Sequence, residues 1–520
     1  MIELFLILSV SGILRFLFSI TPINDVTDDS YYHRYMIKMQ KGKFTPNFIY
    51  TKAIEKVSTG YPRLQHFFLS KFPEKSWLFI GNVSIIFYEL LHILLFYFLA
   101  RELALNFLIE DKIQNSTLFT PWGYSAFLFG TTPLFFPFLS ARLTGISNAR
   151  TLGNLFTFIL YVLWYHIDIM LQFQLLPIAL LFVFLIINTS QFAFQNYSLS
   201  FLFYSILSGS IITFIFLIGS IIFSIGIPST RNIIYYKFQH WKWYFRNGNI
   251  IDRNNLSELI KTPFYLIKEP LKLFEYFFVR FTPFIAMYSI PGIFLLWSHA
   301  LELNEPLLYC VHLLLSSTLI FGITSLKLFL FLGESERYFE YTLTGLYLIL
   351  MGLFLTNSLQ EFNLLALIFI HIVIIIFIFI SKNHTHLSFI KLGRSATNPE
   401  LKALLNFLKP IEKVTLLTYP IKLSVFLAYY TFEMDNVLLY QRMMNPKNGF
   451  GSYAEDIISI EKPITNLSFL KNKYGLTHFI LLKSYKHFTF DLFEEYKLNK
   501  EDIVYENKEY ILIQLNDIKC

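Results

Sequence analysis

The pattern of hydrophobic and polar positions divides the chain into a long membrane-like part and a polar C-terminal part. A helix needs about 20 apolar residues to cross a bilayer core about 30 Å thick. Runs of that kind predict spans at residues 2–20, 77–100, 118–139, 151–168, 174–190, 198–227, 281–299, 306–331, 338–357 and 362–381. A break at Ser208-Gly209-Ser210 would divide 191–227 into two helices, which gives about eleven spans.

The composition supports a polytopic α-helical membrane protein. Hydrophobic residues make up 54% of the chain, which is rare in a soluble protein of this length. The first span has no basic leader and contains Arg15, so it is predicted to be an uncleaved helix. The net charge of +7 is spread over loops, which suits anionic lipid head groups and carries no nucleic-acid signature. Membrane lipids are therefore expected partners, and nucleic acid is not.

Two long polar segments interrupt the apolar runs. The first loop, residues 21–76, follows the first span directly. The second segment, 228–280, alternates aromatic with basic residues, a composition typical of the membrane interface. We predict an interfacial helix in this second segment.

After Ser381 the composition changes, and residues 395–520 contain no membrane-length run. Alternating helix and strand patterns predict a small soluble α/β domain of about 125 residues beside the transmembrane module of residues 1–390. The expected elements are helices at 399–408 and 464–474, strands at 413–419, 436–441 and 478–483, and a hairpin of 503–505 with 510–515. Gly475 is a natural residue to end the second helix.

The first loop contains the main candidates for chemistry. Asp28 and Asp29 are adjacent carboxylates, which suit a general base or a hard divalent cation. The same residues also suit the N-terminus of a helix through Tyr31–Met39. His33 would lie one helical turn from Asp29, in an orienting or a plain surface position.

Further candidates follow along the chain. Tyr61-Pro62-Arg63-Leu64-Gln65-His66 begins with an extended Tyr-Pro step and leads into a predicted helix that ends near Pro73. Its Tyr61 and His66 would either face a shared cavity or lie at the interface without a ligand. Arg142 and Arg150 flank a short connection, where they would hold a phosphate or set the membrane topology.

A late polar turn combines acidic, basic and aromatic residues. Glu336, Arg337 and Tyr338 stand between two apolar runs, so Arg337 could hold a lipid phosphate while the lipid tail stays in the bilayer. The alternative is an ion-paired hairpin turn. Within the spans, Arg15, Glu89, His92 and Lys327 are costly to bury and are interpreted first as structural supports.

Three of these motifs, in this order, resemble the GT-C superfamily of integral membrane glycosyltransferases, which use polyprenyl-phosphate-linked sugars. The motifs are the acidic pair of the first loop, the Tyr-Pro-x-x-x-His segment of the protein O-mannosyltransferase branch, and an acidic-Arg-aromatic motif: Asp28–His33, Tyr61–His66 and Glu334–Tyr338. The last motif resembles the His-Lys-Glu-Glu-Arg-Phe motif of lumenal mannosyltransferases. Gly333, Glu334 and Ser335 depart from that motif, so only its last three residues carry over.

The resemblance implies roles for these residues. Asp28 or Asp29 would be the catalytic base, and Asp28 is preferred. Arg337 would bind phosphate together with Arg142 or Arg150. The remaining substrate-binding candidates are His33, Tyr61, His66, Glu336 and Tyr338. The resemblance also places the first loop and the C-terminal domain on the outer, periplasmic face of a bacterial inner membrane. The excess of Lys and Arg in the first loop runs against the positive-inside tendency.

The expected function is inverting transfer of a sugar from a polyprenyl-phosphate donor to the hydroxyl of a glycan, lipid or protein acceptor. No metal-ligand cluster is evident in the sequence, and a divalent cation stays an open option. Two alternatives are a lipid-linked saccharide transporter and a non-catalytic scaffold whose C-terminal domain binds a partner. A transporter predicts polar residues near the membrane midplane, whereas the polar residues here concentrate in loops.

Overall fold

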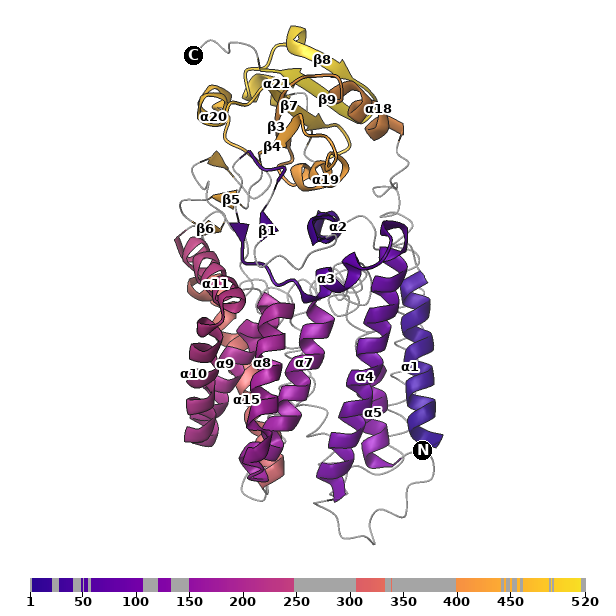
Figure 1. The fold of residues 1–520 in the computed structure, drawn as a ribbon, viewed down its shortest axis with the longest axis vertical. Helices are drawn as coiled ribbons and strands as arrows, with labels where there is room; N and C mark the ends of the chain where they lie inside the picture. Colours follow the sequence, from indigo (N-terminus) through magenta and orange to yellow (C-terminus); the bar gives the residue numbers. More distant parts are fainter. Residues whose placement is uncertain are drawn as a thin grey trace, which may run out of the picture.

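Helices that follow the apolar runs build one end of the molecule, and a small sheet builds the other (Figure 1). The computed structural model describes residues 2–20, 28–40, 48–49, 51–54, 58–105, 120–131, 149–246, 305–332, 338, 399–440, 444–445, 449–450, 456–458, 462–485, 488 and 491–515. The N-terminus lies at the end of the helical bundle far from the C-terminal sheet (Figure 1). Helix α1 (Ile2–Ile20) therefore brings the chain to the side where the first loop begins.

The helices of the bundle, long and short, follow most of the predicted spans that the structure describes. They are α4 (Trp77–Leu105), α5 (Pro121–Thr131), α7 (Ala149–Trp164), continued by η5 (Tyr165–Ile169), η6 (Phe173–Leu175), α8 (Leu176–Thr189), α9 (Gln191–Ser208), α10 (Ile211–Gly226), α11 (Pro228–Arg246), α15 (Glu305–Ser325) and η10 (Lys327–Leu332). Within the described residues, three helices are long and apolar enough to span a membrane, or up to four if the bent pair α10–α11 is one span. The predicted spans at 281–299, 338–357 and 362–381 lie outside this part of the chain, so the total of eleven stays a prediction.

The predicted break after Ser208 is confirmed. Gly209 adopts a left-handed φ of 69°, a conformation that glycine tolerates without steric cost, and it ends α9. The Ser210 side chain then accepts a hydrogen bond from the Thr213 amide and caps α10. The single span predicted at 198–227 is therefore wrong, because the chain reverses at this break.

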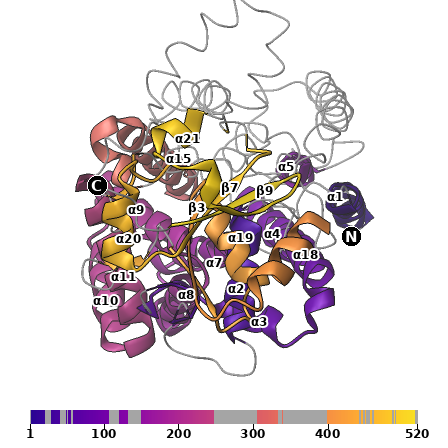
Figure 2. The same ribbon diagram turned by 90° about the horizontal axis from the view of Figure 1, so that it is seen from above.

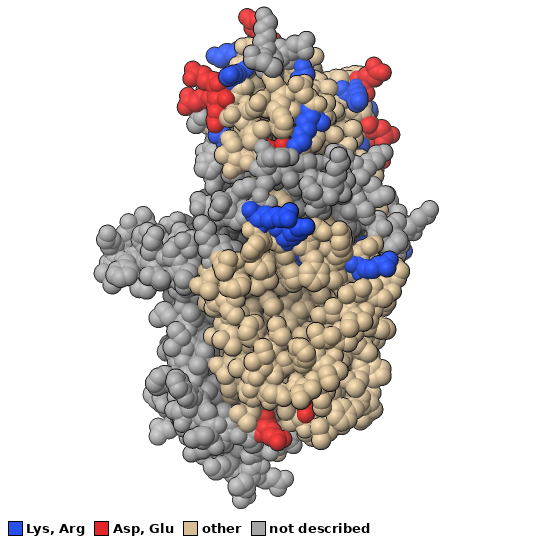
Figure 3. All heavy atoms as spheres, turned by 90° about the vertical axis from the view of Figure 1, so that its left-hand side faces the viewer, with Lys and Arg blue, Asp and Glu red and all other residues tan. Residues whose placement is uncertain are grey.

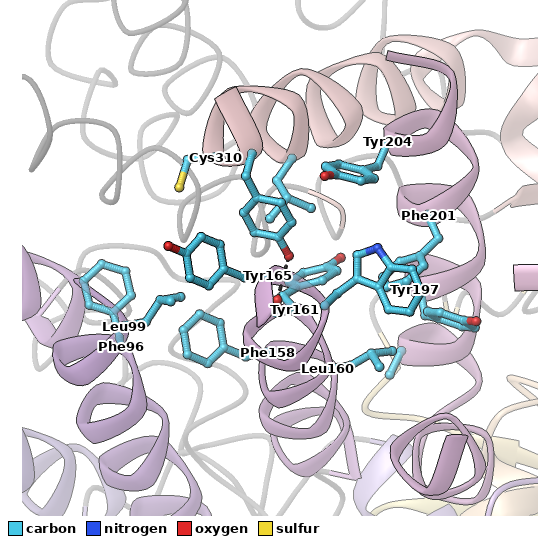
Figure 4. Packing of buried hydrophobic residues seen from close by; sticks show 14 of the residues in the cluster. Phe96, Leu99, Phe158, Leu160, Tyr161, Tyr165, Tyr197, Phe201, Tyr204 and Cys310 are labelled. Atoms are coloured by element: carbon cyan, nitrogen blue, oxygen red, sulfur yellow. Dashed lines mark hydrogen bonds between the residues drawn. The ribbon is translucent and has the colours of Figure 1, made fainter. Parts of the chain in front are cut away.

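Aromatic rings fill the core of the bundle. Figure 4 shows Tyr161 of α7 beside Phe201 of α9, and Phe158 on the other side of α7 beside Phe96 of α4, with α15 close by. The Tyr309 hydroxyl of α15 donates to the Tyr161 carbonyl over 2.6 Å. Such a pairing satisfies a polar group that would otherwise be costly inside the bilayer.

An ion pair lies within the first helices of the bundle. Arg15 is fully buried and lies 3.3 Å from the Glu89 carboxylate, and it donates to the Gly130 carbonyl over 2.6 Å. Glu89 therefore pairs with Arg15 across two helices. His92 packs against the rings of Phe129 and Phe158. Both residues act as structural supports, as predicted.

The C-terminal segment folds into a mixed five-stranded sheet with the strand order β4-β3-β7-β9-β8. Figure 2 shows its strands β3, β7 and β9 from above. Its elements are α18 (Pro399–Leu408), β3 (Val414–Tyr419), α19 (Leu423–Tyr430), β4 (Val437–Leu439), β5 (Met444–Asn445), β6 (Gly449–Phe450), α20 (Leu467–Tyr474), β7 (His478–Leu482), α21 (Asp491–Glu495), η14 (Lys500–Asp502), β8 (Ile503–Glu506) and β9 (Tyr510–Gln514). The predicted strands and the closing antiparallel hairpin are present. Helices α19 and α21 had no counterpart in the prediction.

The first loop is interlocked with the C-terminal sheet. Its regular elements are α2 (Asp28–Gln40), the paired strands β1 (Phe48–Ile49) and β2 (Ser58–Thr59), α3 (Leu64–Ser70) and η2 (Glu74–Ser76). Ala53 forms a parallel bridge with Leu439, and the Leu439 amide donates to the Lys52 carbonyl over 2.8 Å. The loop thus covers the β4 edge, whose backbone groups would otherwise be unpaired there.

Helix α2 lies between the bundle and the sheet domain (Figure 1). Its Tyr31 ring packs edge-on against Phe426 at 4.6 Å and contacts Tyr429 and Tyr430 at 5.7 Å, all on α19. On the opposite side α2 packs against α3. The helix that carries the acidic pair is therefore held from both sides.

Candidate functional site

The acidic pair opens a helix, as one of the two sequence interpretations expected. Helix α2 begins at Asp28 and includes Asp29, so both residues stand in its first turn. Carboxylates are favourable there because the helix N-terminus carries a partial positive charge. The side chains of both aspartates lie outside the described part of the structure. Their catalytic role therefore stays a prediction.

The centre of the candidate site is a pair of histidines from two different helices. His33 of α2 and His66 of α3 share a hydrogen bond, with 2.6 Å between His33 Nδ1 and His66 Nε2. Their rings are stacked with an angle of 3° between planes, and the two residues are 8% and 1% exposed. The pair links the helix of the acidic residues to the helix that follows the Tyr-Pro step.

Burial keeps both imidazoles neutral. It lowers the pKa of His33 to about 3, and the positive charge of Arg150 lowers it further in the same direction. Burial likewise holds the pKa of His66 well below its ordinary range, with His33 adding to the effect and the Pro62 carbonyl opposing it. Because neither ring is charged near neutral pH, one nitrogen of the pair donates and the other accepts.

Tyr61 completes an aromatic cluster around the pair. Its ring centroid lies 5.8 Å from those of His33 and His66, and 5.7 Å from Tyr32. The preceding Gly60 allows this approach, because a Cβ there would lie 2.3 Å from the Asn232 carbonyl oxygen of α11. The Gly-Tyr-Pro sequence therefore fits the chain between α11 and the histidines.

Two cations accompany the cluster. Arg150 lies in the first turn of α7, where the helix N-terminus adds positive potential to its own charge. Its effect on the pKa of His33 places the guanidinium within electrostatic reach of α2. Arg63, at the start of α3, is only 2% exposed, and burial lowers its pKa to about 10, so it stays charged.

The sequence analysis did not single out Arg63 as a functional residue, although it lies inside the Tyr61–His66 motif. Its backbone amide donates to the Asn188 carbonyl of α8 over 2.9 Å, which fixes the entry to α3 against the bundle. Its position directly after Tyr-Pro and before an apolar helix is the only signal that the sequence offered.

Of the other predicted substrate-binding residues, the structure describes only Tyr338, which does not contact this cluster. Arg142, Glu336 and Arg337 lie outside the described residues. Tyr338 is fully buried against α9, where its hydroxyl pairs with the Gln195 amide and donates to the Leu332 carbonyl over 2.7 Å. The Phe192 ring packs on it at 5.2 Å.

A second set of contacts joins α2 to the C-terminal domain. Lys38 Nζ lies 3.2 Å from Glu74 Oε1 and 4.3 Å from the Tyr429 ring centroid. The Tyr429 hydroxyl donates to the same carboxylate of Glu74, while Arg34 lies over the Tyr31 and Tyr429 rings. No sequence pattern could have paired residues so far apart in the chain.

A metal-binding group is not found within the described residues: they contain no cluster of three or more His, Cys, Asp or Glu side chains. The two carboxylates predicted for a divalent cation, Asp28 and Asp29, are outside that search.

Comparison with known proteins identifies the architecture. No protein-family model matches the sequence, and neither does any curated protein. The structure resembles the Archaeoglobus fulgidus oligosaccharyltransferase in complex with Zn and sulfate, with a TM-score of 0.52 and 13% identity over 92% of this chain and 68% of that one. The Archaeoglobus fulgidus oligosaccharyltransferase AglB in complex with an inhibitory peptide and a dolichol-phosphate gives 0.52, with 11% identity over 92% and 69%. The apo form gives 0.51, with 12% identity over the same shares.

The chain has the GT-C fold. This confirms the fold that the three motifs implied, over nearly the whole chain. At such low identity the similarity concerns the fold alone, and assignment to the protein O-mannosyltransferase branch stays a prediction.

Proposed function

We propose that this protein is a membrane glycosyltransferase that moves a sugar from a lipid-phosphate donor to an acceptor hydroxyl. The observation that carries the proposal is the assembly of α2, α3 and the start of α7 into one cluster on a GT-C fold. The first-loop motif, the Tyr-Pro motif and Arg150 are separate in sequence, and they meet at His33.

In the proposed reaction, Asp28 or Asp29 takes the proton of the acceptor hydroxyl. The acceptor oxygen then attacks the anomeric carbon, the bond from that carbon to the phosphate oxygen breaks, and the lipid phosphate leaves. A phosphate is already a good leaving group, so a base on the acceptor is the main requirement. Direct displacement inverts the anomeric configuration.

Positive charge near α2 supports binding of the donor phosphate. Arg150 combines a guanidinium with the N-terminus of α7, two features that favour phosphate oxygens. The neutral histidine pair adds no competing charge. Of the alternatives Arg142 and Arg150, we assign Arg150 to the donor phosphate, together with Arg337, for which the resemblance implies this role.

The histidines are better placed to orient α2 than to contact the substrate. His33 and His66 are nearly inaccessible and use a ring nitrogen each on one another. With Tyr61 against both rings, they fix the distance between α2 and α3. Small displacements of a reacting group reduce rates strongly, so this support matters for the base.

The test is transfer of a labelled sugar from a polyprenyl-phosphate donor by purified protein in lipid nanodiscs. Asp28→Asn and Asp29→Asn are made singly and together, with Asp491→Asn as a matched exposed carboxylate. We expect one single variant and the double variant to lose at least about a hundredfold in rate, as for loss of a general base. Full activity in the double variant would remove this assignment.

A second comparison tests the phosphate contact. Arg150→Gln should raise KM for the donor at least about tenfold, and Arg150→Lys should recover part of the loss because it restores charge without the two-pronged geometry. Arg101→Gln, which changes an exposed arginine on α4, serves as the control.

Offering glycan and peptide acceptors side by side identifies the acceptor. Movement of intact donor across vesicles without transfer would favour the transporter alternative instead.

A further inference from the structure

Helix α11 has an orientation unlike that of the helices around it. It bends by 112° from α10 at the short break between Gly226 and Pro228. A bend of this size turns α11 away from the axis of α10, so the two helices do not form one straight span. Helix α11 lies at the junction between the bundle and the C-terminal segments, where it packs against η10 and β6 (Figure 1).

One face of α11 anchors it to the protein. Ile233, Ile234 and Trp243 are buried, and Tyr236 lies against the Gly60 turn of the first loop. Because Gly60 directly precedes Tyr61, this face adjoins the candidate site. The helix is therefore a fixed part of the fold.

The opposite face alternates basic and aromatic residues. The exposed positions recur every three or four residues and so form one stripe: Arg231, Tyr235, Phe238, Lys242, Phe245 and Arg246. Tyr235, Phe238 and Phe245 are 64%, 54% and 62% exposed, which is unusual for rings of this size. Helix α11 contains no acidic residue.

The three bases of this stripe have no carboxylate partner in the part of the chain that the structure describes. Below them lies the apolar surface of α10, on which Ile211, Ile215 and Ile222 are between 64% and 72% exposed. Figure 3 shows lysines and arginines gathered above a broad surface without charges. Such a border between apolar and basic surface matches the border between acyl chains and head groups.

We propose that the exposed stripe of α11 binds the phosphate head groups of anionic phospholipids, in the leaflet on the side of the first loop. Aromatic rings favour the head-group level, and unpaired Lys and Arg favour anionic phosphate. Three positive charges, with no carboxylate partner among the described residues, select anionic over zwitterionic lipids. The inference does not depend on the proposed transfer reaction.

The test uses the full chain in nanodiscs of phosphatidylcholine mixed with phosphatidylglycerol. Photoreactive phosphatidylglycerol or phosphatidylcholine is added at equal mole fraction, and cross-links to residues 228–246 are quantified by mass spectrometry. We expect a preference for phosphatidylglycerol. The combined variant Arg231→Gln, Lys242→Gln and Arg246→Gln should reduce the preference for phosphatidylglycerol at least about fivefold. Loss of a single base near an anionic surface already corresponds to about that factor.

The matched control is Lys402→Gln, Lys409→Gln and Lys413→Gln, which removes the same charge from exposed positions of the C-terminal domain. This variant should keep the wild-type preference. Should the α11 variant fold poorly, added salt tests the same idea on the wild type, because screening must lower the preference. Equal labelling by both lipids in the wild type would overturn the proposal. Polyprenyl phosphate is then added as a competitor. If it lowers the cross-linking of phosphatidylglycerol far more than its mole fraction explains, the assignment to phospholipid is overturned.

Discussion

The neutral histidine pair makes the stability of the first loop sensitive to acid. In the folded protein His33 stays neutral down to about pH 3, whereas an unfolded histidine binds a proton near its ordinary pKa of 6.5. Acid therefore favours the unfolded chain. The stabilisation from a neutral His33 is complete above about pH 6.5 and is lost progressively as the pH falls towards 3.

The size of this effect follows from the two pKa values. Lowering the pH from about 7.5 to about 5.5 costs about 1.4 kcal/mol of unfolding free energy through His33 alone. His66 contributes in the same direction, because burial also keeps its pKa well below the ordinary value. Asp and Glu side chains with ordinary pKa values stay ionised across this range and add little.

The perturbation is the double substitution His33→Phe with His66→Phe, which keeps two stacked rings and removes both titrating groups. Thermal unfolding in detergent at fixed scan rate, followed by tryptophan fluorescence, gives the midpoint at each pH. We expect acid to lower the midpoint of the wild type more than that of the double variant. Tyr32→Phe, which alters the same cluster but keeps both imidazoles, should behave like the wild type. An acid-induced shift that is the same in all three proteins would refute the assigned neutrality of the pair.

Two further substitutions test the packing around this site and in the bundle. Gly60→Ala should destabilise the protein by about 1–3 kcal/mol, because the new methyl group meets the Asn232 carbonyl; Gly219→Ala, with open space around it, is the control for the thermal midpoint. Arg15→Ala should cost about 3–5 kcal/mol because it leaves the Glu89 carboxylate uncompensated in the bundle. Adding Glu89→Gln to that variant should recover part of the loss, and no recovery would contradict the ion-pair explanation.

Local chemistry was sufficient to predict many individual elements. The left-handed Gly209 and Gly475 ended helices where the sequence placed breaks. The strand His478–Leu482 followed from a continuous apolar run, Phe479–Leu482, which suits a strand covered on both faces. Val414–Tyr419 followed from its β-branched and aromatic residues. Helix α19 escaped prediction, since a short apolar run such as Leu423–Tyr430 does not distinguish a buried helix from a strand.

The candidate site shows the limit of such local signals. The sequence pointed to His33, Tyr61, His66 and Arg150 as separate candidates, and the fold brought these four together. It gave no indication that His33 and His66 bond to each other, because their 33-residue separation leaves no periodic pattern.

The sequence by itself determined which segments are apolar enough for a membrane, where several helices stop, and which residues are candidates for chemistry. These properties depend on side-chain hydrophobicity and on backbone preferences within a few residues. Only the tertiary structure decided that residues 51–54 cover the β4 edge, that α2 lies between α3 and α19, and that α11 turns a basic and aromatic stripe outward. Those outcomes depend on which distant surfaces bury each other, and hydrophobic burial is non-directional, so the pattern of one segment does not specify its partner.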